Sequence, residues 1–174
     1  MDINNLIFNK INSLVGKNKL LDAFGRAGGE WVIFVMFVWF VLSGFLIHLS
    51  TFGELILPFI FLVVAWLIGW VGNIFIGFFV REYRPHISHP DKKILFTPFM
   101  NWKSFPSDHA MTAWLIFFMA MIFSLPFFLG LLPLALWVVW GRVYSGLHYP
   151  IDILGGFAMA FLLAVVSYNI LLIL

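Results

Sequence analysis

Long apolar stretches fill most of this sequence. Trp31 to Leu49 and Leu55 to Val80 contain no Lys, Arg, Asp or Glu. A longer stretch runs from Ser107 to Tyr144, and the last one from Ile151 to Leu174. A helix needs about 20 mostly apolar residues to cross the hydrocarbon layer of a bilayer. The stretches therefore predict membrane-spanning helices, because lipid offers no water to pair with free backbone groups.

The longest of these stretches exceeds the length of one span and contains a turn signal. Leu125-Pro126 and Gly130 offer a place to turn. We expect one span to end near Leu125 and the next to run from Phe127 to about Val143. The predicted fold class is all-α: a polytopic membrane helical bundle with five transmembrane helices over residues 31–174.

The first 30 residues differ from the rest because charged residues interrupt them. Apolar residues recur between the charges at near-helical spacing: Leu6, Ile7, Ile11, Leu14, Val15, Leu20 and Leu21. We expect residues 1–30 to form an amphipathic segment that lies on the membrane surface. A cleaved signal peptide is not expected, because no short apolar core with a small-residue cleavage site follows the basic residues.

The composition excludes several classes of protein. The chain is 63% hydrophobic and 10% charged, whereas soluble domains have about 25% charged residues. The absence of Cys excludes disulfides, thiol nucleophiles and thiolate metal sites. A net charge of +2 is too small to indicate a nucleic-acid partner. The class that the composition leaves is an integral protein of a cell membrane, surrounded by membrane lipids. The sequence does not indicate its oligomeric state.

Five spans would place the cationic parts of the chain on one side of the membrane. Residues 1–30, the loop 81–106 and the connection 142–150 share that side, so all 10 Lys and Arg lie on it. The positive-inside rule would make it the cytoplasmic side. Cations that serve chemistry do not follow that rule, so the side that the site faces stays open.

Charged residues are rare in the C-terminal part, and each lies at a predicted helix end. Residues 107–174 contain only Asp108, Arg142 and Asp152. A charge at membrane depth costs about 2.5–3.5 kcal/mol on insertion scales and usually marks function. These three residues and their neighbours are therefore the candidates for a site.

His148 and Asp152 are four residues apart and can face each other across one helical turn. A carboxylate on one imidazole nitrogen leaves the other nitrogen free as a nucleophile or base. In an alternative interpretation, Asp152 caps a helix that begins at Pro150 and His148 is an interfacial ring.

Ser107 is placed as the N-cap of a helix whose first turn contains His109. The free N–H groups and the dipole of such a helix end attract phosphate. Simple capping is the alternative here.

Arg84 and Arg142 carry guanidinium groups that match phosphate oxygens in pairs. Either one alone could extend to lipid headgroups. Together with Ser107, two His and an oriented Asp, they are the groups needed for phosphoryl transfer through a phosphohistidine.

The sequence motifs around Arg84, Ser107 and His148 resemble those of the type 2 phosphatidic acid phosphatase superfamily, also called lipid phosphate phosphatases. The family pattern is Lys-x6-Arg-Pro, then Pro-Ser-Gly-His, then Ser-Arg-x5-His-x3-Asp. The chain has Arg84-Pro85, then Pro106-Ser107-Asp108-His109, then Gly141-Arg142-x5-His148-x3-Asp152. The similarity runs from about Gly69 to Gly156.

Three positions depart from the family pattern. The family Lys falls on Gly77, so one phosphate ligand is missing, and Arg81 and Lys103 are candidates to replace it. Asp108 stands where the family has Gly, and Gly141 where it has Ser. The lost Lys, the Phe-Pro-Ser-Asp-His string and the string around His148 resemble the bacterial undecaprenyl-diphosphate phosphatase branch.

The resemblance implies a role for each matching residue. His148 would attack phosphorus, Asp152 would orient it, and His109 would protonate the leaving oxygen. Phosphate binding is assigned to Arg84, Ser107, Arg142 and Asp108. The family needs no metal or other cofactor. The implied substrate is a lipid phosphate, and the branch points to undecaprenyl diphosphate and to recycling of the cell-wall lipid carrier.

Other interpretations stay open. Phosphatidylglycerophosphate or phosphatidic acid could be the substrate. A small transporter or a pseudoenzyme would use the same charges without catalysis. His86 and His89 with Asp91 resemble a metal triplet, although no helical spacing supports such a site.

Overall fold

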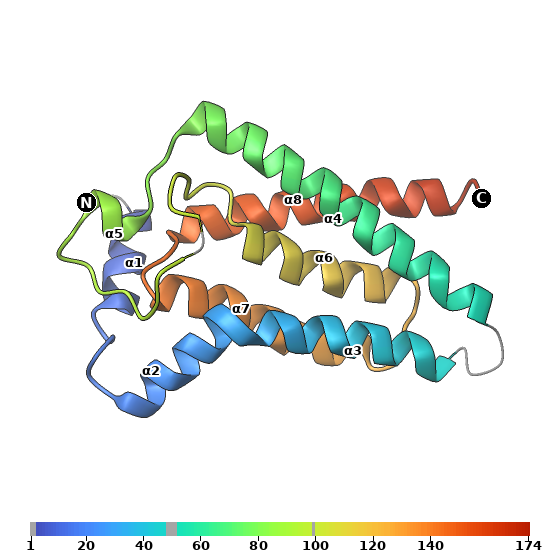
Figure 1. Cartoon of the computed structure of the whole chain (residues 1–174), viewed down its shortest axis with the longest axis horizontal. Coiled ribbons are helices and arrows are strands. Elements are labelled where there is room, and N and C mark those ends of the chain that lie inside the picture. Colours follow the sequence, from blue (N-terminus) through green and yellow to red (C-terminus); the bar gives the residue numbers. More distant parts are fainter. Residues whose placement is uncertain (1–2, 48–51, 99) are drawn as a thin grey trace.

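The computed structural model describes residues 3–47, 52–98 and 100–174, which form a bundle of lengthwise helices (Figure 1). The described residues contain helices and no strand, which confirms the all-α prediction. The long helices are α3 (Val32–Ile47), α4 (Phe52–Val80), α6 (Asp108–Ile122), α7 (Leu131–Tyr144) and α8 (Pro150–Leu171). The short ones are α1 (Ile3–Asn12), α2 (Lys19–Arg26), the π-helical η1 (Ala27–Trp31), α5 (Pro85–Ser88) and the 3-10 turn η2 (Phe128–Gly130).

Three helical stretches in the described residues are long and apolar enough to cross a membrane. They are Lys19–Leu46, Ile56–Ser88 and Pro150–Leu171. Asp108–Ile122 and Phe128–Tyr144 are apolar but shorter. The 15 residues of α6 cover roughly 22 Å at 1.5 Å per residue, less than a hydrocarbon layer of about 30 Å. The count of five transmembrane helices therefore stays a prediction.

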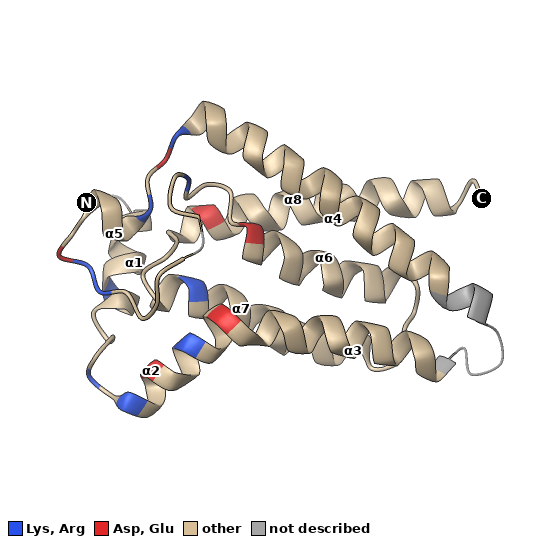
Figure 2. Cartoon of the chain, in the orientation of Figure 1, with Lys and Arg blue, Asp and Glu red and all other residues tan. Residues whose placement is uncertain are grey.

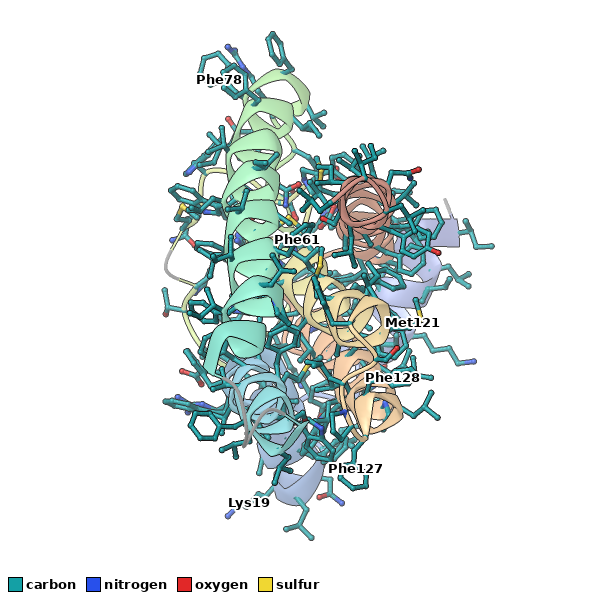
Figure 3. All side chains as sticks on the ribbon, turned by 90° about the vertical axis from the view of Figure 1, so that its right-hand side faces the viewer. Lys19, Phe61, Phe78, Met121, Phe127 and Phe128 are labelled. Carbon is teal, nitrogen blue, oxygen red and sulfur yellow. The ribbon has the colours of Figure 1, made fainter. Side chains whose placement is uncertain are left out.

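Helix α6 is the centre of the bundle. It packs against α8, α7, α4 and α3, and most of its side chains are buried. Phe61 of α4 meets Phe123 at the end of α6, with ring centroids 5.4 Å apart (Figure 3). The outer helices expose large apolar side chains such as Phe75 and Phe161. A helix that is enclosed by others and surrounded by apolar outer faces is the arrangement expected of a bundle in lipid.

The N-terminal segment joins the bundle without a break in the helix. The sequence predicts a change at Trp31, but α2 continues through η1 into α3. Gly28 and Gly29 do not end the helix, because their backbone packs directly on α7. A Cβ on Gly28 would lie 2.4 Å from Cδ1 of Trp137, and one on Gly141 would lie 2.4 Å from the Gly29 nitrogen. The surface location of residues 1–30 stays a prediction.

Charged side chains in the described residues gather at the end of the bundle that holds α1, α2 and α5 (Figure 2). The N-terminal ends of α6 and α8 and the C-terminal ends of α4 and α7 meet there (Figure 1). The loop between α5 and α6 folds over the same end. The sequence motifs, far apart along the chain, are therefore brought to one end of the helices.

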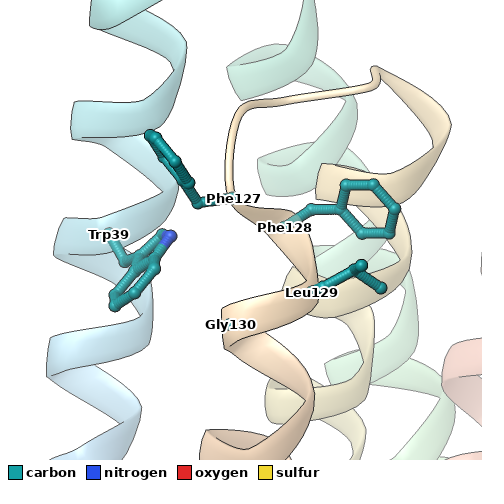
Figure 4. A pocket seen from close by; sticks show the side chains of 5 residues that line it. All are labelled: Trp39, Phe127, Phe128, Leu129 and Gly130. Atoms are coloured by element: carbon teal, nitrogen blue, oxygen red, sulfur yellow. The ribbon is translucent and has the colours of Figure 1, made fainter.

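Among the residues whose side chains the structure describes, the opposite end carries no Lys, Arg, Asp or Glu (Figure 2). The turn between α6 and α7 faces Trp39 of α3 across a surface pocket of about 510 Å³ (Figure 4). Helix α6 ends at Ile122, three residues before the predicted end, because Ser124 and Phe127 take positive φ values that a helix does not allow. The turn still lies at the predicted place.

Candidate active site

The connection between α7 and α8 holds His148 against Asp152. Tyr149 is the N-cap of α8, and its N–H donates to Oδ2 of Asp152 at 2.8 Å. The same oxygen lies 3.3 Å from Nδ1 of His148. Asp152 therefore caps the helix and orients the imidazole with one carboxylate. The capping contact of the alternative interpretation is present, but His148 is 2% exposed and is therefore not an interfacial ring.

Two guanidinium groups converge on the other nitrogen of the ring. Nη1 of Arg84 lies 3.1 Å from Nε2 of His148, and Nη2 of Arg142 lies 3.4 Å from it. Guanidinium nitrogens only donate hydrogen bonds, so Nε2 is the acceptor. The ring proton is then on Nδ1, where it faces Asp152. Nε2 is left with its lone pair directed at a strongly cationic region.

Backbone carbonyls fix both arginine side chains. Nη1 of Arg84 donates to the Leu147 carbonyl at 3.2 Å, and Nη1 of Arg142 donates to the Gly29 carbonyl at 2.9 Å. Both side chains are buried, and among the described residues neither Nε atom has a hydrogen-bond partner. Two buried cations with unused donors favour an anion with several oxygens, such as a phosphoryl group.

The start of α6 faces the same site. Ser107 is the N-cap, and its Oγ accepts from the Ala110 N–H at 3.4 Å. The Ser107 N–H donates to the Asp152 carbonyl at 3.0 Å, which ties the start of α6 to the first turn of α8. Gly156 permits this approach, because a Cβ there would lie 2.5 Å from the Ser107 carbonyl oxygen. The helix end thus presents its free N–H groups beside His148.

One pocket of about 610 Å³ is lined by five of the seven predicted residues, and Ser107 and Asp152 lie outside its lining. Arg84, Asp108, His109, Arg142 and His148 all line it. The two imidazoles therefore belong to a single cavity at one end of the bundle. The structure brings the residues together, and their individual roles stay predictions.

Asp108 is held by its own neighbours. Its carboxylate accepts from Nδ2 of Asn73 at 2.9 Å and forms an ion pair with Lys103 at 2.9 Å. An ionised carboxylate has no hydrogen to donate to phosphate. If position 108 contacts phosphate, as the sequence predicts, the contact would come from its backbone N–H at the start of α6.

Ser104 is a residue of the site that the sequence analysis missed. It is fully buried, and its Oγ donates to Oδ2 of Asp152 at 2.5 Å. Its N–H donates to the Glu82 carbonyl at 2.8 Å, which fixes the loop over the site. Nothing in the sequence marks this serine, because its partner is 48 residues away and no motif includes it.

Of the two candidates to replace the family lysine, only Lys103 comes near the site. Lys103 is buried and bound to Asp108, whereas Arg81 is exposed and its Nε donates to the Phe78 carbonyl at 3.2 Å. In the described part of the chain, no group of three or more His, Asp or Glu is placed to hold a metal ion, and this includes His86, His89 and Asp91.

The ionisation of His148, in the connection outside α7 and α8, suits a nucleophile. Burial lowers the pKa of its imidazole well below the ordinary value, and the charges of Arg84 and Arg142 lower it further. A neutral imidazole whose Nε2 carries no proton is the form that attacks phosphorus.

Two solved structures share the fold of this chain. No curated protein sequence matches the chain. The crystal structure of Aquifex aeolicus LpxE is similar with a TM-score of 0.70 and 24% identity, over 97% of this chain and 96% of that one. A PAP2-type phosphatidylglycerolphosphate phosphatase from Bacillus subtilis is similar with a TM-score of 0.57 and 21% identity, over 96% of this chain and 93% of that one.

The family profile covers the helices that build the site. The profile of the PAP2 superfamily matches residues 57–172, which extend from α4 to the end of α8 and include every motif discussed above. The chain therefore belongs to the PAP2 superfamily.

Proposed function

We propose that this multi-pass protein of the cell membrane is a metal-independent lipid phosphatase that works through a phosphohistidine. The observation that carries the proposal is the position of Nε2 of His148, with Arg84 at 3.1 Å and Arg142 at 3.4 Å. A phosphoryl group bound by the two guanidiniums would lie next to that lone pair. Asp152 on Nδ1 would stabilise the positive charge that the ring gains on attack.

The reaction would have two steps. Nε2 of His148 attacks phosphorus, the bond to the leaving oxygen breaks, and His109 donates a proton to that oxygen. Water then attacks phosphorus while His109 takes a proton from the water, the bond between phosphorus and Nε2 of His148 breaks, and inorganic phosphate is released. Arg84, Arg142, the Ser107 hydroxyl and the backbone N–H of Asp108 would hold the three other oxygens throughout.

The pocket supports a substrate with a lipid tail. Beyond the polar residues it is walled by apolar side chains of α3, α4 and α6: Ile33, Phe34, Phe37, Leu62, Val63, Trp66, Trp70 and Ile116. The cavity thus passes from the cationic site into the hydrophobic part of the bundle. A phosphate that enters from the bilayer would bring an acyl or prenyl chain into this space.

Undecaprenyl diphosphate is the proposed substrate, on the resemblance of the motifs around Ser107 and His148 to that branch. Phosphatidylglycerophosphate is the second candidate, because the similar protein from Bacillus subtilis is a phosphatidylglycerolphosphate phosphatase. Phosphatidic acid is the third. The three lipids share a terminal phosphoryl group and differ in the leaving group and the tail.

Phosphate release from purified lipids tests the proposal. We expect the purified protein in detergent to hydrolyse undecaprenyl diphosphate faster than the other two lipids, with or without EDTA. Substrate labelled in the terminal phosphate should leave label on the denatured protein, and His148→Ala should remove both label and turnover. His89→Ala is the matched control, because His89 is exposed at the same end of the bundle. Turnover by His148→Ala, or a metal requirement, would contradict the mechanism.

A further inference from the structure

Lys103 is a buried cation next to the site. Its side chain is nearly inaccessible, with 1% of the residue exposed. Its ammonium donates to the Pro106 carbonyl at 3.0 Å and to Oδ1 of Asp108 at 3.0 Å. These two acceptors flank Ser107 in the sequence. One ammonium therefore bridges the residues before and after the N-cap of α6.

Gly77 leaves the space through which this lysine passes. A Cβ on Gly77 would lie 2.5 Å from Cδ of Lys103 and 3.3 Å from its Cβ. Real side chains do not approach so closely, so any residue larger than glycine would displace the lysine stem. The loop lysine fills the place beside α4 that a side chain at position 77 would take.

A second residue of α4 holds the same carboxylate. Asn73 lies one helical turn before Gly77 and is completely buried. Its Nδ2 donates to Oδ1 of Asp108 at 2.9 Å. The first turn of α6 is thus held to α4 by Asn73 and to the loop by Lys103.

We propose that Lys103 is a positioning residue of the active site: its ammonium fixes the first turn of α6, and with it Ser107 and His109. The inference rests on the proposed phosphatase function, because it names a residue that keeps that site in order. Lys103 does not line the pocket, and Asp108 and His109 do. Lys103 therefore acts through its contacts with this turn.

Lys103 also belongs to the charges around His148. Those charges are Arg84 before α5, Arg142 on α7, Lys103 on the loop and Asp152 on α8, with His109 on α6. The positive charge of Lys103 helps to keep the pKa of His148 low. Loss of Lys103 should raise that pKa. As the pH falls, His148 should therefore become protonated at a higher pH than in the wild-type protein.

The first experiment replaces the ammonium. Lys103→Met keeps the length of the stem, and we expect kcat/KM for the lipid phosphate to fall about tenfold or more, because a hydrogen-bonded charge is lost. The acid limb of the kcat/KM profile should move to higher pH, and Lys103→Arg should recover part of the rate. Lys92→Met is the control, because Lys92 lies in the same loop and pairs with the exposed Asp91.

The second experiment moves the lysine to α4. Gly77→Lys alone should be inactive, because two stems would compete for one space. Gly77→Lys combined with Lys103→Ala should recover the activity that Lys103→Ala loses. The reason is that the Cβ of a lysine at position 77 would lie where the Cδ of Lys103 passes in the wild-type protein. Gly77→Met with Lys103→Ala fills the space without charge and should not recover it. Comparison of these two double variants separates a role of the ammonium from simple packing.

Three results would overturn the inference: a wild-type rate and acid limb in Lys103→Met, equal recovery with Met and Lys at position 77, or no recovery with Lys in a folded variant. Stabilisation against heat by inorganic phosphate is the second readout. We expect Lys103→Met to lose most of it and the relocated lysine to restore it. If the wild-type protein hydrolyses no lipid phosphate but shows this pattern, the proposed function fails and the role of Lys103 stands.

Discussion

The two ends of the helix bundle have pockets of similar size and opposite character. At the N-terminal end of α6 the pocket is lined by two arginines, two histidines and Asp108, together with apolar residues. At the C-terminal end of α6 the pocket is lined by Trp39, Phe127, Phe128, Leu129 and Gly130 (Figure 4). The same helices form both ends, so helix packing alone does not make a site.

The two ends differ in the contacts that hold their polar side chains in place. Three polar groups at the first end are fixed by contacts from other segments: Arg142 by the Gly29 carbonyl, Asp152 by Ser104, and Asp108 by Asn73. At the second end, the pocket is lined by apolar side chains and Gly130. The comparison therefore predicts large effects for substitutions at the first end and small ones at the second.

His109→Ala should have the largest effect among the substitutions considered next. His109 is the proposed acid in the first step and base in the second, and such a group contributes about 10²–10⁴-fold to a rate. We expect kcat on a natural lipid phosphate to fall by that amount. With a lipid analogue that carries an aryl phosphate, whose leaving oxygen needs no proton, the rate of the first step, measured as the burst of released aryl alcohol, should fall much less.

The two substrates provide the control for His109. The same variant and the same pocket are used, so a folding defect would lower both rates alike. An equal loss on both substrates would contradict the role of general acid. Full activity on the natural lipid would place the acid elsewhere in the pocket.

Ser104→Ala should have an intermediate effect. The variant removes the 2.5 Å hydrogen bond to Oδ2 of Asp152 and leaves the pocket lining unchanged. A hydrogen bond to a charged group is worth about 1.5–3 kcal/mol, which corresponds to roughly 10- to 150-fold. We expect this loss in kcat with KM nearly unchanged, measured by phosphate release.

Ser88→Ala is the matched control for Ser104. Ser88 is exposed at the same end, and its Oγ donates to the Tyr83 carbonyl at 3.4 Å. It should leave kcat unchanged. A wild-type kcat in Ser104→Ala would show that Asp152 needs no support from the loop.

Features that depend on local spacing could be predicted from the sequence. The apolar stretches predicted the long helices, and the spacing of four positions from His148 to Asp152 predicted that the two side chains face each other. Ser107 is the N-cap that its position before an apolar helix indicates. In each case the deciding interactions join residues within one or two helical turns.

Features that depend on contacts between distant segments could not be predicted. The sequence indicates a boundary at Trp31, but glycines 28 and 29 continue the helix because α7 packs on their backbone. Ser104 lies in a loop without a motif, and its partner Asp152 is known only once α8 and the loop meet. Lys103 could be named as a candidate, but only the fold shows that it passes Gly77.

The smallest effect is expected for Trp39→Leu, and Trp70→Leu is its counterpart at the other pocket. Both tryptophans are partly buried, and each lines one pocket. Trp39→Leu should change kcat/KM by no more than about twofold, as for surface substitutions away from a site. Trp70→Leu removes part of the wall that would contact the lipid tail, so KM should rise about tenfold. Because the two substitutions are chemically identical, equal effects would mean that the apolar end also binds substrate, and the contrast between the two ends would be wrong.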